Sequence, residues 1–195
     1  MKVENVVLQG RWVRLEPLAE EHLSGMAAAI EDGTLWEIPF TIVPHPNDLP
    51  QFLNDAQSAY AAGRDLAFAT LDAQSGQVLG STRFRSIETR HRRVEIGFTF
   101  LAASRQRTRV NTEAKFLMLS HAFDVWGCHR VEFVTDERNA SSRAAILRIG
   151  AREEGILRNH MVMRDGYVRN SVLYSLIASE WPHAKDALIA KLLAD

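Results

Sequence analysis

The chain has a single cysteine, which excludes an internal disulfide because a bridge needs two thiols. No apolar run approaches the roughly 20 residues that a membrane-spanning helix needs. The N-terminal Met-Lys-Val-Glu-Asn lacks the apolar core of a signal peptide. We therefore expect a cytoplasmic protein that does not associate with membranes. Cys128 is predicted to be a small buried residue rather than a catalytic thiol.

An excess of charge of either sign is also missing. Lysine and arginine number 23 and the acidic residues 24, giving a net charge of −1. Nucleic-acid binding is therefore not favoured, and the arginines are not interleaved with stacking aromatics. The seven histidines show no metal-ligand spacing, so we predict no metal site. The role of each arginine cluster therefore has to be inferred from its neighbours in the sequence rather than from the net charge of the chain.

Repeats, linkers and low-complexity segments are absent as well. The length of 195 residues is that of one domain, and we predict a single domain over 1–195, with a core at 11–177 and a C-terminal helix at 180–193. Period-two alternation predicts seven strands, at 11–15, 66–71, 78–87, 93–101, 130–135, 153–163 and 167–177. Three-four spacing of apolar residues predicts helices at 16–30, 49–62, 109–126, 139–149 and 180–193.

The order of these elements predicts a mixed α/β domain with one βαβ unit over 93–135. Prolines exclude regular structure over most of 36–50, and Asp165-Gly166 predicts a hairpin turn. The segment 94–115 is the most informative, since an apolar strand leads through a basic turn into a helix. Arg105, Arg107 and Arg109 in that turn join the free N–H groups of the helix start, which predicts a site for a phosphorylated ligand.

Four motifs follow one another in order along the chain. They are Glu95-Ile96-Gly97-Phe98, Thr112-Glu113-Ala114, Asn139 with Ser142, and Ile149-Gly150-Ala151 followed by Glu153-Glu154-Gly155. Together they resemble the GNAT superfamily of acyl-CoA-dependent N-acyltransferases, nearest to its ribosomal-protein N-terminal (RimJ/RimL-like) branch. The resemblance implies a single-domain fold with a twisted, mixed seven-stranded sheet flanked by helices and splayed between the fourth and fifth strands. It also implies acetyl-CoA as cosubstrate and direct transfer of an acetyl group to a primary amine, either a protein N-terminus or a small molecule.

The resemblance also implies which residues bind the coenzyme. The family turn usually reads Gln/Arg-x-x-Gly-x-Gly/Ala, and this chain has Arg107 and Arg109 at the two glycine positions. Arginine there either clamps the phosphates or obstructs them. The implied coenzyme-binding residues are Ile96, Gly97, Phe98, Thr99, Arg105, Gln106, Arg107, Thr108, Arg109, Val110, Asn111, Asn139, Ser142 and Arg143.

For catalysis, the resemblance points to Glu95 as the base for the acceptor ammonium and to Ser142 as the hydroxyl near the leaving sulfur. Each has an alternative. Glu95 can be a surface carboxylate paired with Arg92 or Arg93, and Ser142 can lie exposed. Asn139 either holds the pantetheine amides or caps its helix. Gly97 marks either a bulge with close backbone approach or a glycine tolerated by packing.

The acceptor site is expected at the proline-rich loop, where Trp36 and Phe40 form a wall or else belong to the core. Tyr174 is expected to pack in the core. An alternative function is a non-catalytic acyl-CoA-binding module with the same fold. The C-terminal helix can pack within the domain or against a second copy, and we expect a homodimer.

Overall fold

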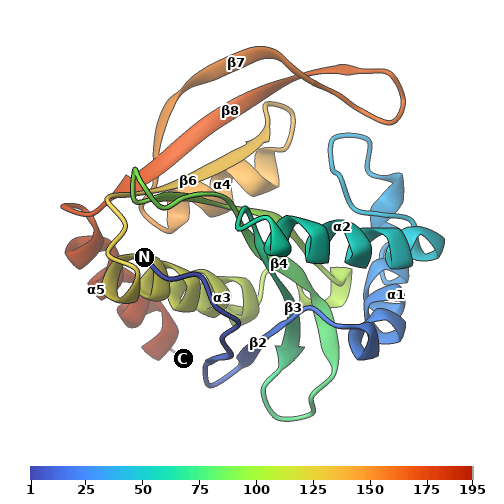
Figure 1. Ribbon diagram of the computed structural model, residues 1–195, viewed down its shortest axis with the longest axis horizontal. Helices are drawn as coiled ribbons and strands as arrows, with labels where there is room; N and C mark the ends of the chain where they lie inside the picture. The colour runs from blue at the N-terminus through green and yellow to red at the C-terminus, as the bar shows by residue number, and fades with distance from the viewer. Residues whose placement is uncertain (195) are drawn as a thin grey trace.

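An eight-stranded mixed sheet forms the centre of the structure, a computed structural model that describes residues 1–194 (Figure 1). The strand order is β1-β2-β3-β4-β5-β6-β8-β7, and only the pair β5–β6 is parallel. Residue 195, the last of the predicted domain, lies outside the described part. The strands are β1 (Leu8–Gln9), β2 (Val13–Pro17), β3 (Leu66–Asp72), β4 (Val78–Glu88), β5 (Arg93–Leu101), β6 (Arg130–Asp136), β7 (Arg152–Val162) and β8 (Val168–Ile177).

The α/β fold class is confirmed, but the predicted count of seven strands is one short. The additional strand is β1, which pairs with β2 through Leu8↔Leu15 and Gln9↔Arg14. Two residues are too few to show a period, so the alternation rule could not detect this strand.

The start of β2 differs from the prediction because of one buried carboxylate. Glu113 accepts hydrogen bonds from the backbone N–H groups of Arg11 (2.8 Å), Trp12 (2.7 Å) and Val13 (2.8 Å). Arg11 and Trp12 therefore turn towards the Glu113 carboxylate, and the strand β2 begins only at Val13. A side chain at Gly10 would meet the Glu113 carboxyl group at 2.4 Å, so the turn needs glycine.

Five α-helices flank the sheet. They are α1 (Leu23–Glu31), α2 (Leu49–Ala61), α3 (Arg109–Ser120), α4 (Ala140–Arg148) and α5 (Trp181–Leu193). The first starts later than predicted, because Glu16 and Pro17 complete β2 and a single 3-10 turn at Glu20–His22 comes before the helix. The third is also shorter, since a π-helical turn at His121–Val125 replaces its predicted last residues.

Two hydrophobic clusters occupy the two faces of the sheet. The larger contains buried residues of α3 and α5, and the smaller gathers Met26 and Ile30 of α1, Leu49 of α2 and Phe100 of β5. Figure 1 shows α3 and α5 together, away from α1 and α2. In α5, Leu188 and Leu192 pack within the domain, whereas Ile189 and Leu193 are exposed.

Strands β5 and β6 pair over a short distance only. Their register runs from Arg93↔Arg130 to Glu95↔Glu132, after which no pairing of the two strands is found among residues 1–194. On its other side β5 has a bulge, since the register with β4 shifts between Ser81 and Arg83. The expected divergence of the fourth and fifth predicted strands is therefore present, between β5 and β6.

Glu113 should be a major contributor to stability, because it satisfies three backbone donors at once. Glu113→Ala is expected to lower the free energy of unfolding by about 3 kcal/mol, since each buried N–H left without a partner costs about 1–3 kcal/mol. Chemical denaturation measures this change. Glu31→Ala, at an exposed position near the end of α1, is the control and should be nearly neutral. An equally small effect at Glu113 would contradict the role of this carboxylate.

Candidate active site

The bulge in β5 changes which face of the sheet each side chain occupies. Before it, Val94 and Ile96 face the α3 cluster, whereas after it Leu101 does so and Phe100 joins the other cluster. The inserted residue is Phe98, whose φ of 47° lies in the left-handed region. The bulge predicted near Gly97 is thus present, but the left-handed residue is its neighbour.

Two arginines hold the bulge residue in place. The guanidinium carbons of Arg83 and Arg85 lie 4.5 and 4.4 Å from the centroid of the Phe98 ring. These cation–π contacts help to offset a backbone conformation that a bulky residue rarely adopts. A side chain at Gly97 would meet the Glu95 carboxylate at 2.8 Å and Arg85 Cδ at 3.0 Å, so glycine leaves room for this ion pair.

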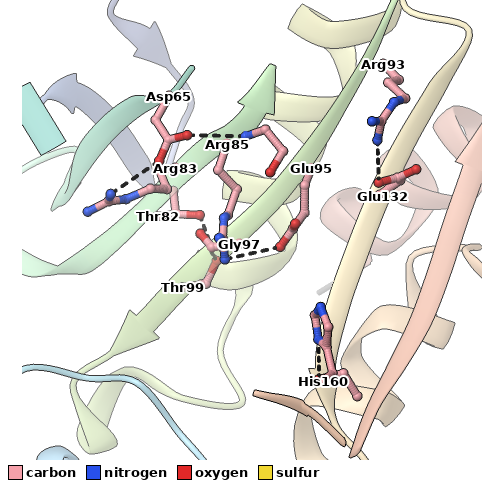
Figure 2. Close-up of polar contacts among 12 residues, drawn as sticks. Asp65, Thr82, Arg83, Arg85, Arg93, Glu95, Gly97, Thr99, Glu132 and His160 are labelled. Carbon is pink, nitrogen blue, oxygen red and sulfur yellow. Dashed lines mark hydrogen bonds and ion pairs between the residues drawn. The ribbon is translucent and has the colours of Figure 1, made fainter. Parts of the chain in front are cut away.

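Glu95 lies at the head of the gap between β5 and β6, with 8% of its surface exposed. Its Oε1 is 3.5 Å from Arg85 Nη1 (Figure 2). The alternative of a surface carboxylate paired with Arg92 or Arg93 is wrong, because Glu95 is buried and pairs with Arg85, and Arg93 bonds to Glu132 at 3.3 Å. Burial raises the pKa of Glu95 above its usual value, and the Arg85 charge opposes this rise. A carboxylate with a raised pKa is a stronger proton acceptor.

The basic turn before α3 keeps the backbone shape that glycine would provide. Arg107, at the first of the glycine positions, has φ of 60°. Thr108 follows as the N-cap of α3, and its hydroxyl accepts a hydrogen bond from the Val110 N–H at 3.3 Å. The N–H groups of Arg109 and Asn111 have no partner within the helix at this position.

A hollow of about 380 Å³ lies beside this helix start. Four cationic side chains line it, together with two threonines and a leucine. The lining residues are Arg107, Thr108, Arg109, Thr112, Arg148, Lys191 and Leu192. Positive charge and free N–H groups together make an anion site.

The other predicted arginines of the turn are engaged elsewhere. Arg105 donates to Gln77 at 3.4 Å, and Arg109 donates to the Ala194 carbonyl and lies over the Trp12 ring. Gln106 donates from its side chain to the Leu101 carbonyl at 3.0 Å. Of the three arginines, Arg107 is therefore the one whose side chain is exposed beside the hollow.

The start of α4 also lies near the gap. Asn139 is the N-cap, and its Oδ1 accepts the Ser142 N–H at 3.0 Å. The capping alternative is therefore realised, which leaves the side-chain NH₂ of Asn139 for a ligand. Ser142 is half-buried. Arg143 is directed to the back of the helix, where it donates to Tyr174 Oη at 2.9 Å, and Tyr174 is fully buried as expected.

The proline-rich loop contains Trp36 and Phe40, the two aromatics expected at the acceptor site. Trp36 stands edge-on to His45 with ring centroids 5.2 Å apart, and Phe40 lies 6.0 Å from the Arg138 guanidinium carbon. Both aromatics are half-buried. Arg164, in the turn between β7 and β8, donates to the carbonyls of Thr41 (3.3 Å) and Val43 (2.9 Å), which ties the loop to the hairpin.

Lys115 is a site residue that sequence reasoning missed. Its Nζ donates to Thr99 Oγ1 at 2.7 Å and to Thr82 Oγ1 at 3.2 Å, and it is 7% exposed. Burial lowers its pKa to about 7. The signal in the sequence was its position three residues after Thr112 and four before Leu119, on the buried face of α3.

Other chemistry is not apparent in the described residues. Within 1–194, His, Cys, Asp and Glu form no group of three with metal-ligand geometry. Cys128 is 2% exposed, and burial raises the pKa of its thiol to about 11, which agrees with a packing role. None of the helices over the same range combines the length and apolar character of a membrane span.

Known proteins share this architecture. The family described as "Acetyltransferase (GNAT) domain" matches residues 13–152. The crystal structure of a GCN5-related N-acetyltransferase from Brucella melitensis is 33% identical, with a TM-score of 0.86, and the match covers 97% of this chain and 86% of that one.

Two further relatives are more distant. RimJ of Mycobacterium smegmatis, in complex with CoA-disulfide, is similar in fold, with a TM-score of 0.79 at 24% identity over 92% of this chain and 88% of that one. The uncharacterized N-acetyltransferase YoaA of Bacillus subtilis is 25% identical over 118 residues, which are 60% of this chain and 66% of the relative. The match thus spans slightly less than two thirds of that protein.

The buried Lys115 should make stability depend on pH. Its folded pKa of about 7 is below the ordinary 10.5, so between these values the unfolded chain binds one more proton and stability rises with pH. Lys115→Met should remove this slope and raise the free energy of unfolding at pH 7 by on the order of 2 kcal/mol. Denaturation between pH 6 and 10 tests this, with the exposed Lys2→Met as control. An unchanged slope in Lys115→Met would exclude the lysine as its source.

Proposed function

We propose, because this chain belongs to the GNAT family of acetyltransferases, that it is an acetyl-CoA-dependent N-acetyltransferase. It moves the acetyl group directly from the thioester to a primary amine, either a protein N-terminus or a small molecule. One observation carries the proposal. The gap between β5 and β6 has a buried, raised-pKa carboxylate at its head and an anion site at the start of α3.

The geometry of the chain fits acetyl-CoA along this gap. The phosphates belong at the start of α3, where Arg107, Arg148 and Lys191 line the hollow. The pantetheine arm belongs along the unpaired edge from Ile96 to Thr99, where backbone groups left free by β6 can bind its amides. Asn139, at the start of α4, is placed to add its side-chain NH₂.

The chemistry needs a neutral amine and a proton for the departing thiolate. Glu95 accepts the proton of the acceptor ammonium, directly or through water, and the amine lone pair then attacks the thioester carbonyl. The carbon–sulfur bond breaks, and the Ser142 hydroxyl protonates the thiolate and is reprotonated from the amine or solvent. Holding both reactants in one gap supplies most of the rate enhancement.

The non-catalytic alternative is not favoured. Its direct support was the replacement of glycine at Arg107 and Arg109, yet Arg107 adopts the conformation that glycine would provide. Four further expectations stay proposals. The protein is cytoplasmic, and it forms a homodimer through the exposed residues of α5. Trp36 and Phe40 form a wall of the acceptor site, and nucleic acids and membranes are not partners.

Arg107 is expected to clamp the coenzyme phosphates. Calorimetric titration with acetyl-CoA should give micromolar binding that weakens with dephospho-CoA, and Arg107→Gly should weaken it about tenfold by removing a charge-assisted contact. Arg92→Gly is a matched control, because Arg92 is also exposed and left-handed, with φ of 48°, but lies outside the hollow.

Both glycine variants should gain stability by relieving backbone strain, and only Arg107→Gly should lose affinity. Tighter binding in Arg107→Gly would mean that the arginine obstructs the site. Failure of the wild-type chain to bind acetyl-CoA at millimolar concentration would overturn the proposed function.

Glu95 is expected to act as the base. With an amine panel, Glu95→Gln should lower kcat by about 10²–10⁴ at low pH. The loss should shrink at high pH, where the acceptor is already neutral in solution. The wild-type kcat/KM should fall on the acid side through a pKa above the ordinary 4.5, because burial raises it. Glu88→Gln, at an exposed carboxylate on β4, is the control. A loss independent of pH would argue against a base.

A further inference from the structure

Arginines outnumber acidic groups around Glu95. Each acidic group here has a guanidinium partner, and one arginine is left over. The pairs are Arg83 with Asp65 at 3.5 Å, Arg85 with Glu95 at 3.5 Å, Arg93 with Glu132 at 3.3 Å, and Arg138 with Asp136 at 3.3 Å. The remaining arginine is Arg169, on β8, which forms no ion pair and no side-chain hydrogen bond with residues 1–194.

Arg169 is nevertheless buried, with 5% of its surface exposed, and its Nε has no hydrogen-bond partner. Burying an N–H donor without a hydrogen-bond partner is unfavourable, so the unpaired Nε needs an explanation. Asp136 forms its ion pair with Arg138, and only its charge acts on Arg169. Burial lowers the pKa of Arg169, and the charges of Asp136 and Glu95 oppose this change.

The position of Arg169 directs it towards the gap. Ser171 pairs with Asp136 at the end of β6, and Arg169 lies two residues before Ser171 in β8, on the same face. It is therefore beyond the last residue of β6, where β5 has already diverged. Its charge acts on Glu95, and the charge of Arg85 acts on it in turn. Arg85 also has a buried Nε without a partner.

We propose that the acceptor amine carries a carboxylate close to its amino group. Arg169, assisted by Arg85, binds this anion while Glu95 binds the ammonium. The inference rests on the N-acetyltransferase function proposed above and specifies its acceptor. A free amino acid or a peptide with an acidic N-terminal residue offers the same chemistry.

The anion is not a phosphate of the coenzyme. The cations for those phosphates come from α3, α4 and α5. Helix α4 lies on the face of β8 opposite Arg169, because its Arg143 contacts Tyr174 and alternation places Tyr174 and Arg169 on opposite faces. The arginines beside the hollow and the arginines around Glu95 are therefore two separate clusters, and acetyl-CoA explains only the first.

The test compares acceptors that differ only in charge. We would measure kcat/KM, expressed per neutral amine, for alanine against alaninamide and for Glu-Ala-Ala-amide against Gln-Ala-Ala-amide. The anionic member of at least one pair should be favoured about tenfold, and which pair it is distinguishes a free amino acid from a peptide. Arg169→Met should abolish the preference, whereas Arg158→Met, at an exposed position on β7, should keep it.

Binding of the products gives a second readout that does not depend on turnover. N-acetylalanine and N-acetyl-Glu-Ala-Ala-amide are titrated against their neutral counterparts by calorimetry, in the wild type and in Arg169→Met. Tighter binding of an anionic product, lost in the variant, supports the inference even if no acceptor of the panel is acetylated. Equal rates and equal binding for both members of each pair would overturn it and leave the proposed function intact.

Discussion

The early separation of β5 from β6 is the constraint on which the rest of the site depends. Parallel strands that stayed paired would use the backbone groups of both strands in the ladder and leave no edge for a ligand. Here the pairing stops at Glu95↔Glu132, and the bulge at Phe98 turns β5 away. The end of the pairing exposes an edge with Glu95 at its head, and the inserted Phe98 reverses the faces of the residues that follow.

That arrangement needs support from charged groups that are themselves partly desolvated. Arg83 and Arg85 stack on Phe98 and at the same time pair with Asp65 and Glu95. Because these ion pairs are buried or half-buried, their attraction is screened less than at an open surface. Removing one partner would leave an uncompensated charge, so this group of residues stabilises one conformation of the bulge.

Much of the fold could be predicted from the sequence, because strand alternation and helical spacing are local signals. The predicted basic turn lies at the start of α3 and Glu95 at the head of the gap, while their roles in binding and catalysis stay predictions. What the sequence could not show depends on contacts between distant segments. Glu113 moves the start of β2 from a hundred residues away, and Arg169 is unusual only because its neighbours already have partners.

The predicted roles of the arginines illustrate the same limit. Spacing placed Arg105, Arg107 and Arg109 in one turn, but spacing does not give side-chain direction. Tertiary contacts draw the first towards Gln77 and the third towards the C-terminal end of α5. Lys115 was overlooked because a lysine within a helix is usually exposed, whereas two threonines on neighbouring strands hold this one inside.

The two hydrogen bonds from Arg164 have a kinetic consequence. They join the loop at Thr41 and Val43 to the tip of the β7–β8 hairpin (Figure 1), so we expect the two segments to move as one unit while both bonds are formed. Separating them breaks both bonds, at a cost of about 2 kcal/mol, which limits the separated form to about a few per cent of molecules. Opening on this side of the molecule would then follow the breaking of one guanidinium contact, and the closed form would last longer as that contact strengthens.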